Sequence, residues 1–502
     1  MPQPLKILLV SAEVAPIVST GELGRSVGGL AKALKSLEVD IRVVMPRYQN
    51  ANIGLLSLVR LVPEMMIRTV DRFKNTAIYR DELPGEVPVY LVEKDRYFER
   101  DYLYGPPGEA YADNVERFCF FNLASLEMFT QIGFFPDVIH CHDWHTGLIP
   151  AYLKTLFHHD PLYAPIKTLF TVHDLRHQGC FPKESLSVTG LPETVFTPAG
   201  LEFYGDLCFL KSGIVYADIL STESKRYRQD IQTKEWGRGL EGVFQMRSKD
   251  LYGVVNGVDY GQYDPRLDPH IVANYTKDDL ANKRACKLNL LESCGLKPQV
   301  NMPVIAMIAP LHEDKGIDVL IDAFDEMMKL PIRFVFLNDT EDRNTRYASK
   351  FGELMGKYRR HVRCYTEYDE QLKHKILAGA DIIVFPFQSE PCGINQMYAL
   401  KYGTIPLVRA TGGLDDTVTE FSLESGKGTG FKFVDYTAEA FLTSLREALA
   451  VYDNRTLWDL LQANAMRVNY SWVYSAKKYL DLYKLVLNRQ KIPDSTNGNG
   501  GK

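Results

Sequence analysis

The sequence has no apolar run close to the roughly 18 residues that a membrane-spanning helix needs. Its 8 cysteines lie far apart with no Cys-x-x-Cys pair, so the pattern excludes a disulfide framework and a zinc knuckle and favours reduced thiols. A basic block is also missing, because 58 Lys and Arg residues are spread along the chain with 63 Asp and Glu residues. Such a balance creates no field that gathers nucleic acid or an anionic membrane. We therefore expect small or neutral partners, with no nucleic acid and no membrane among them.

We expect no export signal at the N-terminal end. MPQPLKILLV (Met1–Val10) enters a strand-like run too soon for a signal or transit peptide. We expect a cytoplasmic protein of the bacterial type, and a plastid protein whose transit peptide has been removed fits the same residues. Oligomeric state has no signature in the sequence.

The residues that are present predict an α/β protein. At 502 residues, 45% of them hydrophobic, the chain is long enough for two or three domains and can bury two cores. Apolar residues recur at three- and four-residue steps between the first two strand-like runs, as in an amphipathic helix: Val27, Leu30, Ala31, Leu34 and Leu37. The predicted strands are Lys6–Val10, Ile41–Met45, Val89–Val92, Val138–His140, Thr168–Val172, Val254–Val255, Val304–Ala309, Phe334–Leu337, Ile382–Phe385 and Ile405–Val408.

Alternation of strand and helix is typical of a parallel, doubly wound sheet. The polar stretch 257–300, with the turn signals of NGVDYGQYDP, separates two such series and predicts two α/β domains in tandem. Ligands collect at the carboxyl ends of parallel strands, so we expect a binding cleft between the domains. The tail 491–502 has no apolar periodicity and is predicted to be disordered.

The first candidate ligand loop follows the first strand. In SAEVAPIVSTGELGRSVGGL, the small residues Thr20, Gly21 and Gly24 precede the predicted helix. Small residues at this place let backbone N–H groups approach an anion at a helix N-terminus. A plain turn between strand and helix is the alternative interpretation.

Two histidine-rich segments follow neighbouring predicted strands. HCHDWHTGLIP (His140–Pro150) has a histidine spacing that is not a usual zinc signature, so we expect no metal and favour a polar rim that binds sugar. TVHDLRHQGCFP (Thr171–Pro182) again places a histidine beside an aspartate. The two pairs can converge on one site, although isolated histidines are more often structural.

The third candidate segment is SEPCGINQMYALKYGTIPLVRATGGLDDTV (Ser389–Val418). Glu390 comes just after a predicted strand, Gly393 opens a helix, and Gly412 and Gly413 form a second turn. A carboxylate for hydroxyls and backbone donors for phosphate would suit a nucleotide sugar. Structural capping by Glu390 is the alternative.

These segments, in this order, resemble the glycogen and starch synthase family. The resemblance runs from Lys6 to about Leu487, and EPCGINQMYALKYGTIPLVRATGGL is its most specific part. Further matching segments are DNVERFCFFN (Asp113–Asn122), LEFYGDLCFLKSGIVYAD (Leu201–Asp218), GLEGV (Gly239–Val243), VVNGVDYGQYDP (Val254–Pro265), EDKGIDVL (Glu313–Leu320) and YSWVYSAKKYLDLY (Tyr470–Tyr483).

The resemblance implies a glycosyltransferase-B fold, in which two Rossmann-like doubly wound domains face a deep cleft. Residues 1–256 would form the domain on the glucan acceptor side and 257–471 the nucleotide-sugar domain. A C-terminal helix within 472–490 would cross back to the first domain. The implied activity is transfer of glucose from ADP-glucose to the non-reducing end of an α-1,4-glucan, with retention and with no metal or cofactor.

The family pattern also implies roles for single residues. His173 and Glu390 would contact the donor glucose, and Asp143 would lie near the reacting sugar, which makes these three the candidate catalytic residues. On the donor side the pattern adds Thr20, Gly21, Gly24, Lys315, Gly393 and Ile394, of which Lys315 would bind the diphosphate. On the acceptor side it adds Asp113, Asn114, Trp144 and His145.

The chain departs from the family pattern mostly on the donor side. The usual Lys-Thr-Gly-Gly-Leu-Gly-Asp loop reads Ser19-Thr20-Gly21-Glu22-Leu23-Gly24-Arg25, so a lysine is lost and a carboxylate gained. The arginine that pairs with Lys315 across the diphosphate is replaced by Pro310. Asn338 replaces a glycine, Gln388 an arginine, and Asp174 stands where Asn is usual.

These departures leave two main hypotheses for the function, which belong to different classes. Charge-assisted hydrogen bonds contribute about 1.5–3 kcal/mol each, so losing two cations would remove roughly 3–6 kcal/mol. The first hypothesis is a working synthase with a weakened or altered donor site, because Lys315, Glu390, His173 and Asp143 persist. The second is a catalytically impaired homologue that binds glucan or regulates, and a transferase with another donor is a third possibility.

Overall fold

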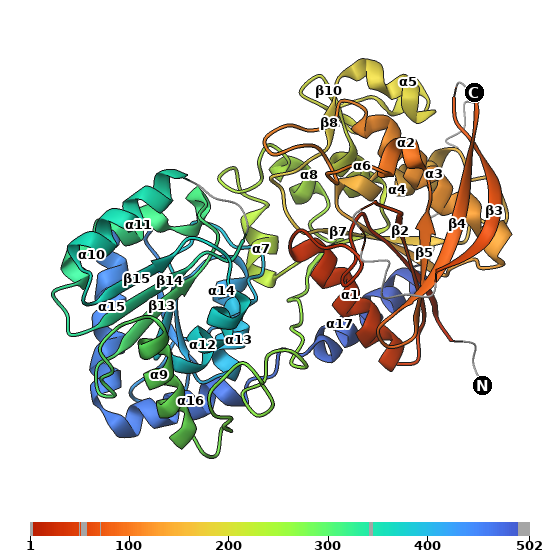
Figure 1. Cartoon of the computed structure of the whole chain (residues 1–502). Helices are drawn as coiled ribbons and strands as arrows, with labels where there is room; N and C mark the ends of the chain where they lie inside the picture. The colour runs from red at the N-terminus through yellow and green to blue at the C-terminus, as the bar shows by residue number, and fades with distance from the viewer. Residues whose placement is uncertain (1–3, 50, 52–57, 71, 341–344, 490–502) are drawn as a thin grey trace, which may run out of the picture. The chain divides into compact units, whose positions relative to one another are not determined.

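The computed structural model describes residues 4–49, 51, 58–70, 72–340 and 345–489 (Figure 1). The chain divides into two compact units, which we treat separately. The N-terminal unit contains Met1–Thr222, Ile231–Val254 and the residues from Ser475 onward, whereas the C-terminal unit contains Glu223–Asp230 and Val255–Tyr474. The tail 491–502 that the sequence predicts to be disordered lies outside the described residues.

A mixed sheet organises the N-terminal unit. Among the described residues its strand order is β12-β11-β7-β6-β1-β2-β5-β4-β3. All pairs from β12 to β5 are parallel, and β3 and β4 form an antiparallel edge. The strands are β1 (Lys6–Val10), β2 (Asp40–Pro46), β3 (Val59–Arg68), β4 (Phe73–Leu83), β5 (Val87–Val92), β6 (Val138–His142), β7 (Lys167–Val172), β11 (Ile219–Thr222) and β12 (Leu251–Gly253).

The helices of this unit are amphipathic or buried. In α1 the predicted apolar positions Val27, Leu30, Ala31 and Leu34 are buried, whereas the fifth, Leu37, is the partly exposed C-cap residue just after the helix. The helices are α1 (Glu22–Ser36), α2 (Asp95–Phe98), α3 (Asn114–Ile132), α4 (Leu148–Thr155), α5 (Leu186–Thr189), α6 (Phe209–Tyr216), α8 (Glu241–Met246) and α17 (Trp472–Asn488). Tyr483 of α17 contacts β6, because its hydroxyl lies 2.9 Å from Nδ1 of His140.

A small second sheet lies beside these elements in the N-terminal unit. Its order is β8-β10-β9, with antiparallel pairing throughout. The strands are β8 (Cys180–Phe181), β9 (Glu202–Phe203) and β10 (Asp206–Cys208).

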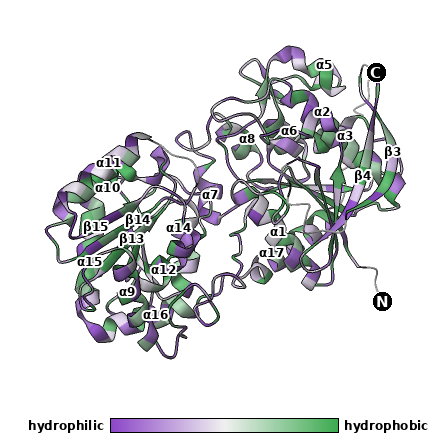
Figure 2. Ribbon diagram, in the orientation of Figure 1, coloured by the Kyte–Doolittle hydropathy of each residue, from purple (hydrophilic) through white to green (hydrophobic). Residues whose placement is uncertain are grey.

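The C-terminal unit is built on a parallel sheet. Among the described residues its order is β15-β14-β13-β16-β17-β18. The strands are β13 (Val304–Ile308), β14 (Arg333–Leu337), β15 (Val362–Tyr365), β16 (Ile382–Phe385), β17 (Ile405–Arg409) and β18 (Phe431–Phe433). β13, β14 and β16 are buried along their whole length, as strands covered on both faces require, and the part of Figure 2 labelled β13 and β14 is largely green, the hydrophobic end of the scale.

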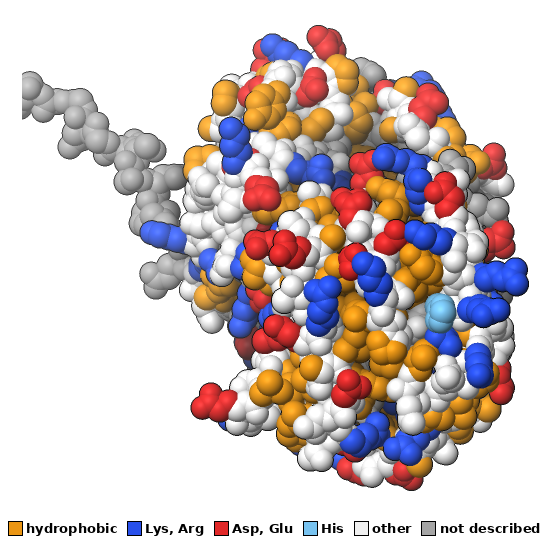
Figure 3. All heavy atoms as spheres, turned by 90° about the vertical axis from the view of Figure 1, so that its left-hand side faces the viewer, with side chains coloured by type: hydrophobic (Ala, Val, Ile, Leu, Met, Phe, Trp, Pro, Cys, Tyr) orange, Lys and Arg blue, Asp and Glu red, His pale blue; other side chains and the backbone are white. Residues whose placement is uncertain are grey.

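Helices surround this sheet. They are α7 (Lys225–Asp230), α9 (Ala281–Ser293), α10 (Ile317–Met327), α11 (Thr345–Lys357), α12 (Glu370–Gly379), α13 (Asn395–Lys401), α14 (Gly412–Thr417), α15 (Ala438–Asp453) and α16 (Arg455–Arg467). No helix among the described residues has the length and apolar character to span a membrane. On the face drawn in Figure 3, acidic and basic side chains are interspersed, which agrees with a formal net charge of −5.

Nearly all the predicted strands are present, and the predicted α/β class with parallel sheets is confirmed. One strand is misplaced. Val254 and Val255 lie beyond β12, which ends at Gly253; the Val254 N–H donates to Thr222, and Val255 already belongs to the C-terminal unit. The apolar pair therefore marks the passage between units and not a strand.

Candidate functional site

Two adjacent parallel strands of the N-terminal unit bring Asp143 and His173 together. Asp143 follows β6 and His173 follows β7. Oδ1 of Asp143 accepts a hydrogen bond from the His173 N–H at 2.8 Å, and Nε2 of His173 lies 3.0 Å from Nδ1 of His142. Burial keeps the pKa of His142 well below its usual range, so this ring is neutral near pH 7. Asp143 has a φ of 56°, a left-handed conformation that marks a strained position.

Trp144 and His145 directly follow Asp143 in the chain and are buried. Their rings stack at 4.1 Å, and their exposed fractions are 7% and 5%. Gly179 covers the indole closely, since a Cβ there would lie 2.3 Å from Trp144. Trp144 and His145, two residues of the predicted sugar-binding rim, therefore pack inside the unit.

Asp113 and Asn114 are held by arginines at the start of α3. Arg100 donates two hydrogen bonds to the carboxylate of Asp113, at 2.8 and 2.6 Å. Burial alone would raise the pKa of Asp113, but the Arg100 guanidinium outweighs it and lowers the pKa. Asn114 is buried and accepts from Arg117 at 2.6 Å. Asp113 and Asn114, two of the four predicted acceptor-side residues, therefore have hydrogen-bond partners within the protein.

The loop before α1 is fixed by a residue that the sequence argument does not identify. Glu13 accepts from the Thr20 N–H at 2.5 Å, from the Thr20 hydroxyl at 2.8 Å and from the Tyr104 hydroxyl at 2.7 Å. A Cβ on Gly24 would lie 2.8 Å from Ser19 and from the Val18 carbonyl oxygen, so this position needs glycine. At Gly21, in contrast, a Cβ would meet nothing within 4 Å.

The two charges that are new to this loop lie near each other. Nη1 of Arg25 is 3.9 Å from Oε1 of Glu22, one turn apart on α1, and both side chains are substantially exposed. The Ser19 hydroxyl donates to the Gly21 carbonyl at 3.0 Å. Arg25 thus shares its charge with Glu22, which reduces what it can offer an anion.

In the C-terminal unit, Lys315 and Glu390 form a buried ion pair. Lys315 Nζ lies 2.9 Å from Oε2 of Glu390 and 3.7 Å from Oδ2 of Asp314, and both Lys315 and Glu390 are less than 10% exposed. Gly316 makes the turn that presents Lys315, with a φ of 64° and no room for a Cβ, which would lie 1.9 Å from the Pro386 carbonyl oxygen. The structure therefore brings together two residues that are far apart in the sequence.

The glycine turns support the Glu390 segment. The Gly413 N–H donates to the Glu390 carbonyl at 2.9 Å, and a Cβ on Gly412 would lie 1.8 Å from that same oxygen. Gly393 has a φ of +69°, and Ile394 precedes the first turn of α13. The N–H groups of Gly412 and Gly413 are already used inside the unit.

Three residues that differ from the family pattern follow β13, β14 and β16, and their surroundings differ. Asn338 is fully buried and its amide donates to the Thr340 and Thr366 carbonyls. Gln388 is exposed, and Pro310 is partly exposed at the end of β13. The side chains at positions 338 and 388 therefore contribute no cation.

The sequence does not predict that the polar residues Asp339, Lys373 and Asn395 form a network. Asp339, which is partly exposed after β14, accepts from the buried Lys373 at 2.9 Å and from the buried Asn395 at 2.8 Å. The only available signal was the position of Asp339 just after a predicted strand, because Lys373 and Asn395 come from α12 and α13.

Among the described residues, no group of three or more His, Cys, Asp or Glu side chains is placed to hold a metal ion.

Comparisons with known proteins agree with this arrangement. Residues 6–246 match the family model described as starch synthase catalytic domain, and residues 295–458 match the one described as glycosyl transferases group 1. A glycogen synthase of Desulforudis audaxviator is 39% identical over 496 residues, which is 96% of each chain. A glycogen synthase of Thermotoga petrophila is 40% identical over 489 residues, which is 96% of this chain and 99% of that one.

Solved structures agree as well. The catalytic domain of starch synthase IV from Arabidopsis thaliana, bound to ADP and acarbose, has a TM-score of 0.87 and 28% identity, and covers 97% of this chain and 100% of that one. Sucrose-phosphate synthase from Thermosynechococcus elongatus, at 16% identity and a TM-score of 0.58, shares the fold. The fold and the polar strand ends thus define a glycosyltransferase of the glycosyltransferase-B class. Within that class, the chain belongs to the glycogen and starch synthase family.

Proposed function

We propose that this protein transfers glucose from ADP-glucose to the non-reducing end of an α-1,4-glucan, with retention and with a weakened grip on the donor diphosphate. The observation that carries this proposal is the ion pair between Lys315 and Glu390 at 2.9 Å. It joins the residue proposed for the diphosphate to the one proposed for the glucose. The names of the relatives, and the ADP and acarbose bound by the Arabidopsis enzyme, support the substrate class.

Lys315 would stabilise the negative charge that grows on the departing diphosphate. Electrostatic stabilisation by a fixed, buried cation is a large contribution to catalysis of this kind. Because Glu390 already neutralises Lys315, the diphosphate must compete for the ammonium group. A second cation would ease that competition, and position 310, where the family has one, holds proline.

The proposed sugar-binding residues act mainly by positioning. Glu390 would accept hydrogen bonds from glucose hydroxyls, and His173 would orient the donor glucose. Asp143 fixes the His173 backbone at 2.8 Å and would lie near the reacting sugar. No protein nucleophile is proposed, since the leaving phosphate itself would assist attack on the same face.

A second candidate function is a catalytically impaired homologue that binds glucan. The pairing of Arg25 with Glu22 favours it, because the cation in the phosphate loop is partly neutralised there. Both functions predict glucan binding, but only the first predicts transfer of glucose.

Incubation of the purified protein with labelled ADP-glucose and glycogen tests the proposal. Glucose incorporation that requires both substrates and disappears in Glu390→Gln supports transfer. Absence of incorporation, with the protein still retained by glycogen in an affinity gel, overturns transfer and supports the glucan-binding homologue.

A further inference from the structure

Cys180 and Cys208 lie directly opposite each other on the antiparallel strands β8 and β10. The Phe209 N–H donates to the Gly179 carbonyl at 2.9 Å, one residue beyond the pair on each strand. This pattern makes Cys180 and Cys208 a non-hydrogen-bonded pair, whose Cα atoms approach to about 4.5 Å. Disulfides form at Cα separations between about 4.4 and 6.8 Å. The backbone therefore already has the spacing of a cross-strand disulfide.

The two thiols differ in accessibility and acidity. Cys180 is exposed, whereas Cys208 is buried at the N-cap of α6. The hydrogen bond between the two sulfurs lowers the pKa of Cys208, assisted by backbone N–H groups of Leu210 and Lys211, and raises the pKa of Cys180. An exposed thiol beside a buried, more acidic thiol is the arrangement in which one cysteine meets a reagent and the other resolves the adduct.

We propose that Cys180 and Cys208 form a redox modification site that is oxidised by low-molecular-weight disulfides. Cys180, the thiol that a reagent can reach, loses its proton to solvent and attacks the external disulfide, which forms a mixed disulfide and releases one thiolate that takes up a proton. The Cys208 thiolate then attacks Sγ of Cys180 and expels the second thiol. The sum is two cysteine thiols and one external disulfide giving one protein disulfide and two external thiols.

The cross-link would act on the aromatic residues around Trp144, which follows Asp143 in the chain. Gly179, next to Cys180, packs on the Trp144 ring, and Phe181 and Phe209 lie 6.0 and 6.5 Å from the same ring. Joining β8 to β10 would restrain this aromatic cluster. Oxidation should therefore raise the unfolding temperature of the protein.

The test is equilibration of the full chain with oxidised glutathione, followed by alkylation and peptide mapping. We expect a Cys180–Cys208 disulfide peptide, unmodified Cys286 and Cys294 as internal controls, and an unfolding temperature several degrees higher that dithiothreitol reverses. Cys208→Ser should accumulate glutathione on Cys180, because no resolving thiol remains. Full alkylation of both cysteines after equilibration, or a stable glutathione adduct on Cys180 in the unaltered protein, would overturn the proposal.

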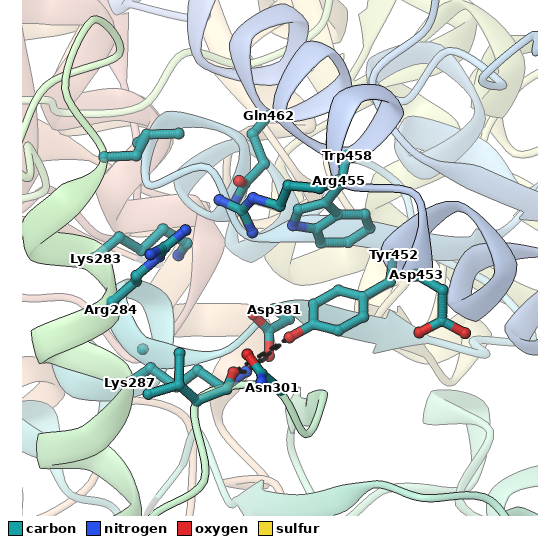
Figure 4. Close-up of a pocket in the computed structure, with 13 residues that line it drawn as sticks. Lys283, Arg284, Lys287, Asn301, Asp381, Tyr452, Asp453, Arg455, Trp458 and Gln462 are labelled. Atoms are coloured by element: carbon teal, nitrogen blue, oxygen red, sulfur yellow. Dashed lines mark hydrogen bonds and ion pairs between the residues drawn. The ribbon is translucent and has the colours of Figure 1, made fainter.

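A separate observation in the C-terminal unit carries a second inference. A cavity of about 270 Å³ lies among α9, α15 and α16, and Figure 4 shows Arg284 and Arg455 beside it. Its polar floor includes Asp381, which immediately precedes β16. Because Glu390 comes after the same strand, the cavity and the Lys315–Glu390 pair belong to opposite ends of β16.

Two buried side chains on the cavity wall have unused hydrogen-bonding atoms. Trp458 is 1% exposed, and its indole N–H donates to no described residue. Gln462 is 3% exposed; its amide nitrogen donates to Gly403 at 2.8 Å, while its amide oxygen accepts from no described residue. The wall thus offers a donor and an acceptor, and Arg284 adds a guanidinium that forms no ion pair with the described residues.

We infer that this cavity binds a small phosphate monoester of a polyol. The Arg284 guanidinium and the indole N–H suit the phosphate oxygens, whereas the Gln462 oxygen requires a donor such as a ligand hydroxyl. A bare anion would leave that oxygen without a partner. Lys287 is already engaged by Asp381 and Arg455 by Asp459, each at 2.7 Å, so Arg284 would supply the charge, and the ligand phosphate would bind on the side of the cavity away from Asp453.

Calorimetric titration with glycerol 3-phosphate, in saturating ADP to occupy the donor site, tests the assignment. We expect binding of one molecule, weakened at least tenfold by Arg284→Gln and several-fold by Trp458→Phe. Arg467→Gln, an exposed arginine of α16 outside the cavity, should not change it. Absence of binding, equal binding of inorganic phosphate, or binding that survives Arg284→Gln would overturn the inference.

Discussion

The Lys315 ammonium lies 2.9 Å from a carboxylate oxygen of Glu390, and both groups are buried. Removing one member of a buried pair leaves the other charge uncompensated, which is more costly than the pair itself. The pair also orders the two groups before a ligand arrives. Donor binding must therefore exchange one ionic partner of Lys315 for another.

Substitution of Lys315 tests its charge and its shape separately. We expect Lys315→Met to lower kcat/KM for ADP-glucose at least a hundredfold, because the one proposed diphosphate cation is lost and Glu390 stays buried without a partner. Lys315→Arg should keep the charge and lose less. Initial rates of glucose incorporation measure both, and equal losses in the two variants would contradict the electrostatic role.

The Glu22–Arg25 pair makes a second prediction. Glu22→Gln should raise kcat/KM for the donor about threefold to tenfold, since Arg25 would no longer share its charge and the loop would repel an anion less. Arg25→Gln should lower it. The effect of Glu22→Gln should shrink at high salt because both side chains are exposed. A decrease in Glu22→Gln at low salt would refute this account of the loop.

Gly316 is predicted to be irreplaceable. Gly316→Ala combines a left-handed φ with a Cβ 1.9 Å from a backbone oxygen, so we expect a loss of at least about 2 kcal/mol in unfolding free energy. Gly242→Ala serves as the matched control, because a Cβ there meets nothing within 4 Å in the short helix α8. Denaturant unfolding compares the two variants, and similar stabilities would contradict the backbone argument.

His374 gives the stability of the C-terminal unit a predictable pH dependence. Burial lowers its pKa, but hydrogen bonds to Asp268 at 2.7 Å and to Glu370 outweigh burial and raise the pKa to about 9. A folded pKa above the ordinary 6.5 means that this stabilisation is complete below pH 6.5 and is lost as the pH rises through 9.

The variant His374→Gln isolates that contribution. We expect it to be less stable than the unaltered protein at pH 6, with the difference shrinking toward pH 10. Denaturant midpoints at several pH values measure the difference. A constant gap across this range would show that His374 contributes through packing and not through its charge.

The sequence predicted the strands well because buried parallel strands are continuous apolar runs. β3 and β4 were missed because their residues alternate between buried and exposed and carry many charges. Asp143 and His173 could be expected together, since both follow neighbouring parallel strands. Their burial, and that of Trp144, could not, because it depends on Gly179 and other residues from distant segments.

On the donor side, too, the sequence identifies residues but not their contacts. Lys315 and Glu390 were both singled out, but their ion pair depends on the turn at Gly316 and on the packing of β13 beside β16. Glu13 carries no motif and became visible only through its hydrogen bonds to Thr20. Sequence pattern identifies residue types at strand ends, whereas the partners they choose are set by tertiary structure.

The central claim is that the diphosphate is held weakly because Lys315 acts without the two cations usual in the family. Calorimetric titration of ADP into the unaltered protein and into the double variant Ser19→Lys with Pro310→Arg tests it most directly. With about 1.5–3 kcal/mol for each charge-assisted contact, the double variant should bind ADP roughly two to four decades more tightly. Ser19→Met with Pro310→Met, which adds length without charge, should show no gain. Tight binding by the unaltered protein, unchanged in the double variant, would contradict the claim.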